Sequence, residues 1–245
     1  MSQQRNARIA LYGGTFDPVH DGHLGVAREL SQLFALDEVL FIPAHVAPHK
    51  RRSVPPATPF HRYAMLALAT QNESRFRILT VELDEPKKPY TVETISRLQE
   101  KSDAHFLFVM GADSWEEITT WREWERLLSM ISHVVVTRPG YELSAEHVPA
   151  TVRERIVDLR GATGAAAAGA VEMTGKQKIY LTDAVKIDVS STQIRRAAQK
   201  FDGDEHTWGR MLVPPPVAEY ITKYRLYREA HETERNDAGR ERAHD

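Results

Sequence analysis

Short apolar runs alternate with amphipathic stretches along most of the chain, a pattern typical of strands and helices that follow one another. Apolar runs predict strands at residues 9–12, 38–43, 77–81, 105–110, 133–137, 178–181 and 185–189. Helical patterns occupy residues 22–34, 58–69, 91–98, 115–130 and, behind a proline, 211–224. Strands that alternate with helices predict an α/β fold with a parallel sheet.

The pattern weakens from Ser144 to about Lys176, where the run 161–170 consists almost wholly of alanine and glycine. We interpret this stretch, 144–176, as a flexible insertion rather than a domain boundary. Residues 1–228 are therefore expected to form one domain. The tail 229–245 is strongly charged and is expected to be disordered.

The composition indicates the class of protein and the kinds of partner to expect. The 245 residues are 42% hydrophobic and 27% charged, which suits an ordinary globular protein with a real core. A net charge of -2 does not indicate the basic surface that nucleic-acid binding needs, so we expect no nucleic-acid partner. The chain has no cysteine, so disulfides and thiolate metal sites are excluded. It shows neither an apolar signal segment nor a run of ~20 apolar residues, so we expect no membrane contact and a cytoplasmic location. The sequence leaves the oligomeric state open.

The first chemical signal follows the strand at 9–12. Gly13 and Gly14 remove Cβ atoms where the backbone would have to approach a ligand closely. His20 and His23 fall at or just before the first turn of the next helix, where free amides and the helix dipole favour phosphate. Reading the two histidines as a metal pair would require a third ligand that is not evident nearby. This stretch therefore predicts an anion site.

The second signal is the run Ser190-Ser191-Thr192-Gln193-Ile194-Arg195. Ser190 and Gln193 fit a capping box, which by itself explains a helix start. Consecutive hydroxyls followed by Arg195 also suit a polyphosphate at a helix N-terminus. The residues alone leave both interpretations open.

Further polar residues follow the carboxyl ends of strands, where ligands of open α/β sheets bind. His45 and Lys50 lie in a basic loop after the strand at 38–43. Gly111 and Asp113 follow the strand at 105–110, and Asp113 could either cap the next helix or accept hydrogen bonds from ribose hydroxyls. Thr91 is expected to cap the helix that it begins.

Taken together, the two motifs resemble those of the nucleotidylyltransferase superfamily. Residues 13–23 are similar to its H-x-G-H signature, and residues 190–195, about 170 residues later, to its S-S-T-x-I-R motif. A finer resemblance to the bacterial nicotinate-nucleotide adenylyltransferase family involves residues 43–50, 90–94, 111–114, 120–121, 138–141 and 220–227. The likeness extends over about 8–227 and implies a Rossmann-like, doubly wound parallel sheet with helices on both faces.

The resemblance also implies a reaction. The 5′-phosphate of nicotinate mononucleotide would attack the α-phosphorus of ATP in line, giving nicotinate adenine dinucleotide and a pyrophosphate that leaves with Mg²⁺. Because the nucleophile is already an anionic phosphate, such a site needs positioned hydrogen-bond donors more than a general base.

Each matched residue receives a role from the same resemblance. The implied catalytic residues are His20, His23 and Arg195. ATP would be bound by Gly13, Gly14, Thr15, Phe16, Gly111, Asp113, Ser191 and Thr192. Nicotinate mononucleotide would be bound by Lys50, His45, Thr91 and Trp121. Its ring would stack on Trp121, although a tryptophan at helical spacing is more often part of a core, and its carboxylate would lie near Thr91.

Three alternatives compete with this interpretation. The same reaction could use pantetheine phosphate or nicotinamide mononucleotide, which the matches at Thr91 and Trp121 disfavour. A class I aminoacyl-tRNA synthetase shares an H-x-G-H type signature, but this chain has no lysine-serine-lysine loop and no basic surplus. A non-catalytic binder with the same fold would not need both histidines together with Arg195.

Overall fold

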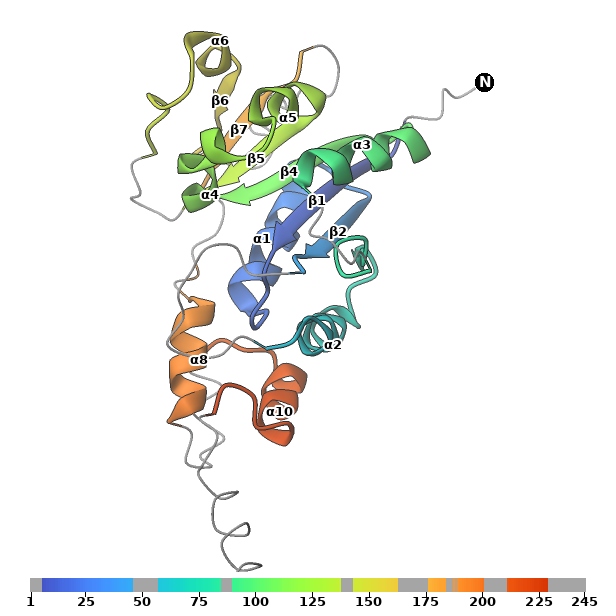
Figure 1. Ribbon diagram of the computed structural model, residues 1–245, viewed down its shortest axis with the longest axis vertical. Helices are drawn as coiled ribbons and strands as arrows, with labels where there is room; N and C mark the ends of the chain where they lie inside the picture. Colours follow the sequence, from blue (N-terminus) through green and yellow to red (C-terminus); the bar gives the residue numbers. More distant parts are fainter. Residues whose placement is uncertain are drawn as a thin grey trace, which may run out of the picture.

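The computed structural model describes residues 6–45, 57–84, 90–137, 143–162, 176–183, 187, 189–200 and 211–228. A seven-stranded sheet with strand order β3-β2-β1-β4-β5-β7-β6 forms its centre, and all neighbouring strands are parallel (Figure 1). The strands are β1 (Arg8–Gly14), β2 (Glu38–Pro43), β3 (Phe76–Ile78), β4 (His105–Gly111), β5 (Ser132–Val136), β6 (Ile156–Asp158) and β7 (Ile179–Thr182). The predicted α/β fold with a doubly wound parallel sheet is confirmed.

Helices contribute to two hydrophobic cores, one on each face of the sheet. The first core receives side chains from α1 (Asp21–Leu33), α2 (Pro59–Thr70), α8 (Ser191–Gln199) and α10 (Pro215–Lys223). The second receives them from α3 (Thr91–Lys101), α4 (Ala112–Glu116), the 3-10 turn η1 (Ile118–Thr120) and α5 (Trp124–Met130). A short helix, α6 (Ala150–Arg153), precedes β6. Figure 1 shows α2, α8 and α10 grouped beyond the carboxyl ends of β1 and β2.

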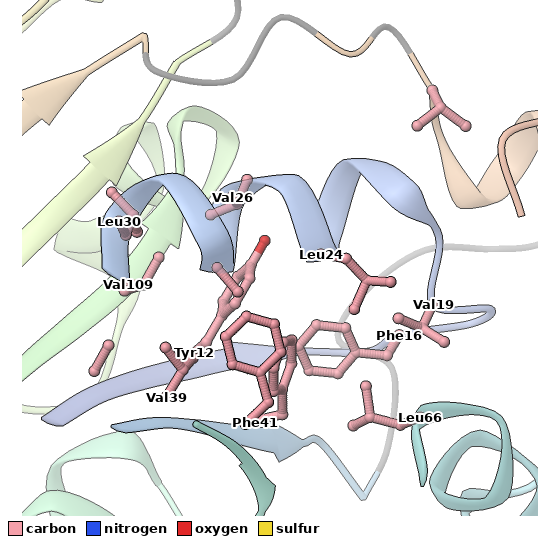
Figure 2. Packing of buried hydrophobic residues seen from close by; sticks show 14 of the residues in the cluster. Tyr12, Phe16, Val19, Leu24, Val26, Leu30, Val39, Phe41, Leu66 and Val109 are labelled. Carbon is pink, nitrogen blue, oxygen red and sulfur yellow. The ribbon is translucent and has the colours of Figure 1, made fainter. Parts of the chain in front are cut away.

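Strand alternation explains why there are two cores. Leu107 and Val109 of β4 belong to the first core, while Phe108 and Met110 belong to the second. Figure 2 shows aromatic rings of the first core gathered between β1 and α1. Phe16 lies among them with its ring centre 5.5 Å from those of both Tyr12 and Phe41. The turn after β1 is thus tied to the core through one buried ring.

Several predicted strands and helices agree with the structure in type and position. β2 has the predicted bounds, and β1 continues two residues past the predicted strand to Gly14. The predicted strand at 77–81 is wrong in extent, because β3 ends at Ile78. Beyond it the Thr80 carbonyl accepts the amides of Leu83 and Asp84, which turns the chain out of the sheet.

The helix predicted at 115–130 is also wrong, because it is broken into α4, η1 and α5. The break falls at residues 121–123, where Glu123 adopts a left-handed φ of 51°. Arg126 donates to the Glu123 carboxylate at 2.8 Å and so supports the new helix start. Left-handed backbone at a non-glycine residue is not visible in a hydrophobic pattern.

The stretch 144–176 differs in part from the flexible insertion that we expected. It contains α6 and the edge strand β6, in which Ile156 is paired with Ile179 of β7. A three-residue edge strand leaves too short an apolar run to detect. Most of the alanine-rich run, most of the strand expected at 185–189 and the tail 229–245 lie outside the described residues. Among the helices that are described, none has the length and apolar character needed to cross a membrane.

We expect a pH dependence of stability from His133 in β5. Its ring is fully buried, and burial lowers its pKa to about 3. The folded protein keeps this ring neutral while the unfolded chain binds a proton below pH ~6.5. Stability from this residue is therefore complete above pH ~6.5 and is lost as the pH falls toward 3, by up to about 1.4 kcal/mol per pH unit.

Urea unfolding of the wild type and of His133→Leu between pH 7.5 and 5 tests this expectation. The free energy of unfolding should fall more steeply with decreasing pH in the wild type. His23, whose pKa is also lowered, contributes in the same sense to both proteins and does not obscure the difference. Equal slopes would show that His133 is not held neutral by the fold.

Candidate functional site

The candidate site lies at the carboxyl end of β1, between β2 and β4. The chain leaves β1 through α1 toward β2 on one side, while β4 pairs with β1 on the other. Connections that diverge in this way open a crevice where ligands of α/β sheets bind. Gly13 and Gly14 sit at this point.

Both glycines lie close against aromatic rings. A Cβ atom on Gly14 would lie 2.8 Å from the Phe16 ring, and one on Gly13 would lie 3.2 Å from the Phe108 ring. The absence of side chains therefore lets two aromatic rings close against the backbone. It also leaves the strand end bare on the side of the crevice.

The turn that follows is held in a strained conformation. Phe16 is buried at 1% exposure and has a left-handed φ of 50°. Such backbone costs of order 1–3 kcal/mol and persists only where its surroundings over-determine it. The Thr15 carbonyl provides one restraint, since it accepts a 2.7 Å hydrogen bond from Arg62 Nη1.

Arg62 connects this turn to the loop after β2. It is only 2% exposed, and its Nη2 donates to the carbonyls of Ala44 at 2.7 Å and His45 at 3.0 Å. Its Nε donates to the Ala57 carbonyl at 3.3 Å. One buried guanidinium thus binds four carbonyl oxygens from three segments, which satisfies the requirement that a buried charge be hydrogen-bonded.

The two predicted histidines stand at the start of α1, as the sequence indicates. His20 is the N-cap residue, and its amide donates to His23 Nδ1 at 3.3 Å. The two rings stack with centres 3.7 Å apart, and the His23 ring also meets Phe16 edge-on at 5.1 Å. Both imidazoles therefore have fixed orientations beside the free amides of a helix N-terminus.

The environment keeps His23 neutral. Burial, followed by the charge of His20, lowers the pKa of His23 well below its usual value. Because Nδ1 accepts the His20 amide, we assign the ring proton to Nε2. His23 can therefore donate one hydrogen bond from Nε2, and at neutral pH it is not a cation.

The second motif lies directly against the first. Ser190 is the N-cap of α8 and accepts the Gln193 amide, so the capping box is confirmed. Ser191 Oγ donates to the Pro18 carbonyl at 3.0 Å. Arg195 Nη1 donates to the Asp17 carbonyl at 2.6 Å. The two motifs are far apart in sequence and meet at the turn Thr15–Pro18.

Arg195 is enclosed by protein rather than open to solvent. It is 7% exposed, and its Nη2 donates to Thr192 Oγ1 at 3.1 Å. The sequence assigned Arg195 to phosphate, and the structure adds a direct contact with the loop that precedes the histidines. Any phosphate held by Arg195 would share the guanidinium with that loop.

A cavity of about 360 Å³ extends from the glycines toward α3. Its lining joins three groups of residues from separate parts of the chain. They are Gly13, Gly14 and Thr15 after β1, Tyr90, Thr91, Thr94 and Ile95 at the start of α3, and Thr120, Trp121 and Arg122 at the helix break. The predicted ATP residues Gly13–Thr15 and the predicted nicotinate residues Thr91 and Trp121 therefore share one cavity.

The start of α3 differs from the prediction by one residue. Tyr90, not Thr91, is the N-cap, and its amide donates to the Glu93 carboxylate at 3.3 Å. Thr91 is the first helical residue, so its amide has no acceptor within the helix. Opposite it, Arg122 lies 4.7 Å from the centre of the Tyr90 ring. The cavity is thus bordered by a helix N-terminus and the Arg122 cation, and Glu82 and Glu117 also line it.

Trp121 owes its position to the break between η1 and α5. Its ring meets Phe108 edge-on at 6.2 Å, and it is only partly buried. In the predicted continuous helix, Trp121 would belong to the face that packs into the core. The break instead leaves the indole in the lining of the cavity.

The lining of this cavity does not include the other described site residues that the sequence predicts, which are Phe16, His20, His23, His45, Gly111, Asp113, Ser191, Thr192 and Arg195. Gly111 is the N-cap of α4 and Asp113 lies in its first turn, so Asp113 does not cap the helix. A Cβ on Gly111 would meet nothing within 4 Å, so packing does not require a glycine there. Lys50 lies outside the described residues. Within the described part of the chain, no cluster of three histidine or acidic side chains could hold a metal.

Sequence reasoning missed several residues that shape the site. Arg62 carried a signal, because it shares a helical face with the buried Met65 and Leu66. Thr94 lines the cavity with a buried hydroxyl that has no hydrogen-bond partner among the described residues, and helical spacing alone did not single it out. Asp17 and Tyr227 are joined by a 2.9 Å hydrogen bond, and nothing local in the sequence pairs them.

Comparisons with known proteins find relatives over most of the chain. Residues 11–197 match the family model described as Cytidylyltransferase-like. The chain is 34% identical to a probable nicotinate-nucleotide adenylyltransferase of Corynebacterium glutamicum, over 92% of this chain and 90% of that protein. It is 38% identical to one of Symbiobacterium thermophilum, over 90% of this chain and 95% of that protein.

Solved structures share the fold. One is the Plasmodium falciparum nicotinic acid mononucleotide adenylyltransferase complexed with NaAD, with a TM-score of 0.63 and 20% identity. The similarity covers 90% of this chain and 97% of that one. The same protein complexed with APC gives a TM-score of 0.62.

Gly22 in α1 provides a test of the histidine geometry. A Cβ at this position would lie 2.9 Å from both His20 Nδ1 and Val189 Cγ1. Gly22→Ala should therefore displace His20 and lower the rate of pyrophosphate release from ATP by about tenfold or more, since small misplacements of catalytic groups have large effects.

Gly25→Ala in the same helix is the matched control. A Cβ there would meet only the end of the Ile187 side chain at 3.1 Å, which can rotate away. Alanine has the higher helix propensity at both positions, by up to about 1 kcal/mol, so a weaker intrinsic helix preference would not explain a loss of activity. Activity in Gly22→Ala equal to that in Gly25→Ala would contradict the prediction that His20 contacts the reacting phosphates.

Proposed function

Because the chain belongs to the nicotinate-nucleotide adenylyltransferase family, we propose that the site at the end of β1 transfers the adenylyl group of ATP to nicotinate mononucleotide. The products are nicotinate adenine dinucleotide and pyrophosphate, and the reaction belongs to NAD biosynthesis.

One observation carries the assignment of the reaction to this place. The glycine turn, which leads into the two histidines, lines the same cavity as Thr91 and Trp121. The residues proposed to bind phosphate and those proposed to bind the nicotinate ring are thus in one cavity, which supports the proposal. This is the arrangement that a reaction between ATP and a pyridine mononucleotide requires.

The chemistry is a displacement at phosphorus. An oxygen of the mononucleotide 5′-phosphate forms a bond to the α-phosphorus of ATP, and the bond from that phosphorus to the bridging oxygen of pyrophosphate breaks. The attacking phosphate is largely ionised at neutral pH, because its second pKa is about 6. The protein therefore needs to hold two anions in line and to offset the charge that develops on the leaving group.

Hydrogen-bond donors at the two helix starts suit that task. His20 and His23 would contact the α- and β-phosphates at the N-terminus of α1. Ser191, Thr192 and Arg195 would contact the β- and γ-phosphates at the N-terminus of α8, with Ser191 donating through its amide because its hydroxyl donates to the Pro18 carbonyl. A neutral His23 fits this role, since it donates from Nε2 and has no proton to lose near pH 7.

Two further groups complete the nucleotide contacts. Gly111 and Asp113, at the carboxyl end of β4, would meet the ATP ribose. His45 and Lys50 would contact phosphate from the loop after β2. Mg²⁺ would enter with ATP as part of the substrate and screen the charge of the pyrophosphate.

Recognition of the acceptor rests on the far end of the cavity. The nicotinate ring would stack on Trp121, and its carboxylate would meet the amides at the start of α3 around Thr91. A helix N-terminus stabilises a carboxylate more than a neutral carboxamide. The site should therefore prefer nicotinate over nicotinamide mononucleotide. Both substrates are soluble polyanions, which supports a cytoplasmic location.

Pyrophosphate release from Mg-ATP against a panel of acceptors tests the function. Nicotinate mononucleotide should give the highest kcat/KM, with nicotinamide mononucleotide at least about tenfold lower, the effect of roughly 1.4 kcal/mol. Pantetheine phosphate should give no turnover. A preference for the amide or for pantetheine phosphate would contradict the acceptor assignment.

His20→Ala tests the phosphate assignment. Loss of a donor to a developing charge typically costs about 100-fold or more in kcat, so most pyrophosphate release should disappear. The far-ultraviolet circular dichroism spectrum should be unchanged. His105→Ala, at the amino end of β4, is a control that should retain activity. Unchanged turnover in His20→Ala would mean that the phosphates bind elsewhere.

A further inference from the structure

We propose that Tyr227 is a positioning residue for adenylyl transfer, which acts through Asp17 on the turn Thr15–Pro18 and on Arg195. The inference rests on the proposed function of that turn. It assigns the segment after α10 a part in the active site, although this segment supplies no residue to the described cavity lining.

The first step is the contact between Tyr227 and Asp17. The Tyr227 hydroxyl donates to Asp17 Oδ1 at 2.9 Å, and the Ala57 amide donates to the same oxygen at 3.1 Å. Asp17 is 1% exposed and Tyr227 is 5% exposed. Two donors from separate segments thus fix the direction of a buried carboxylate, in surroundings where an unsatisfied charge would be costly.

The second step leads from Asp17 to Arg195. Arg195 Nη1 donates to the Asp17 carbonyl at 2.6 Å and lies 3.9 Å from Asp17 Oδ2. The main-chain carbonyl of Asp17 therefore accepts a hydrogen bond from the Arg195 guanidinium, and the Asp17 carboxylate attracts the same group electrostatically. Rotation of the carboxylate would change the field at Arg195 and loosen the turn that leads to His20.

The backbone around Tyr227 indicates that its position is enforced. Tyr227 has a left-handed φ of 67°, and Arg225, two residues earlier, has one of 49°. Left-handed backbone at non-glycine residues is unfavourable unless tertiary contacts compensate it. At the other end of the same segment, the Leu212 carbonyl accepts the Asp21 amide at 2.9 Å. The segment 211–228 therefore contacts both the turn and the start of α1.

The Tyr227 hydroxyl keeps its proton and therefore its hydrogen bond to Asp17 throughout the neutral pH range. Burial, together with the adjacent Asp17 carboxylate, raises the pKa of Tyr227 well above its usual value. The hydroxyl thus stays protonated throughout the neutral range and always donates to Asp17. It works as a fixed restraint and takes no part in proton transfer.

Tyr227→Phe removes this single hydroxyl and leaves the ring in place. In pyrophosphate release with Mg-ATP and nicotinate mononucleotide, kcat should fall by about tenfold, as expected for a loosened catalytic group. The KM for ATP should rise, while the KM for nicotinate mononucleotide should stay within about twofold, because the cavity around Trp121 is untouched. Circular dichroism at the assay temperature establishes that the variant is folded.

Tyr220→Phe is the matched control. The Tyr220 hydroxyl forms a 2.9 Å hydrogen bond with His61 Nδ1, so it also joins the C-terminal segment to α2 without reaching Asp17. Its removal should leave kcat within about twofold of the wild type, as for an isolated structural contact. Kinetics of Tyr227→Phe that match those of Tyr220→Phe would overturn the proposal.

A double variant with Arg195→Lys distinguishes a positioning role of Tyr227 from a merely structural one. If Tyr227 acts through Arg195, Tyr227→Phe should reduce kcat by less than about twofold in the Arg195→Lys background, since groups that act as a unit are non-additive. A full tenfold loss in that background would overturn the coupling.

Asp17→Asn keeps the test decisive should Tyr227→Phe fail to fold. The amide retains an oxygen that accepts from Tyr227 and Ala57 but places an uncharged NH₂ near Arg195, so kcat should also fall about tenfold. Wild-type kcat in Asp17→Asn would overturn the proposal. Absence of turnover in the wild type would instead refute the proposed function, so the two failures are distinguishable.

Discussion

The turn Thr15–Pro18 depends on hydrogen bonds that reach its carbonyl oxygens from two other helices. Arg62 of α2 binds the Thr15 carbonyl, and Arg195 and Ser191 of α8 bind those of Asp17 and Pro18. The C=O and N–H groups of a trans peptide point in opposite directions, so an anchored Thr15 carbonyl also sets the direction of the Phe16 amide. The strained backbone of Phe16 and the fixed entry into α1 both follow from this anchoring.

These contacts explain how one small site can handle two anions. The buried guanidiniums of Arg62 and Arg195 hold the backbone of the turn, and the two stacked imidazoles and the starts of α1 and α8 beside that turn are the donors that we propose for the phosphates. A neutral His23 avoids the repulsion between two adjacent cations that stacking would otherwise impose. Rigid donors of this kind can stabilise developing charge without reorganising during the reaction.

Much of the fold could be predicted from the sequence because the strands of a parallel sheet are buried on both faces. The runs predicted at 38–43 and 105–110 are apolar after their first residue and match β2 and β4 closely. The position of Ser190 followed from helix-capping chemistry, and that of His20 from the apolar spacing of the helix that it precedes. The break at Glu123, which places Trp121 in the cavity, depends on a backbone angle that hydrophobic spacing does not encode. The link between Asp17 and Tyr227 is tertiary and has no local signal.

The most direct test of the account is a crystal structure with a non-hydrolysable ATP analogue and nicotinate mononucleotide bound together. The account predicts the α-phosphate within hydrogen-bond reach of His20 or His23, the β- and γ-phosphates at the start of α8, and the nicotinate ring on Trp121. Phosphates bound away from the two histidines, or a ring outside the cavity between Thr91 and Trp121, would contradict it.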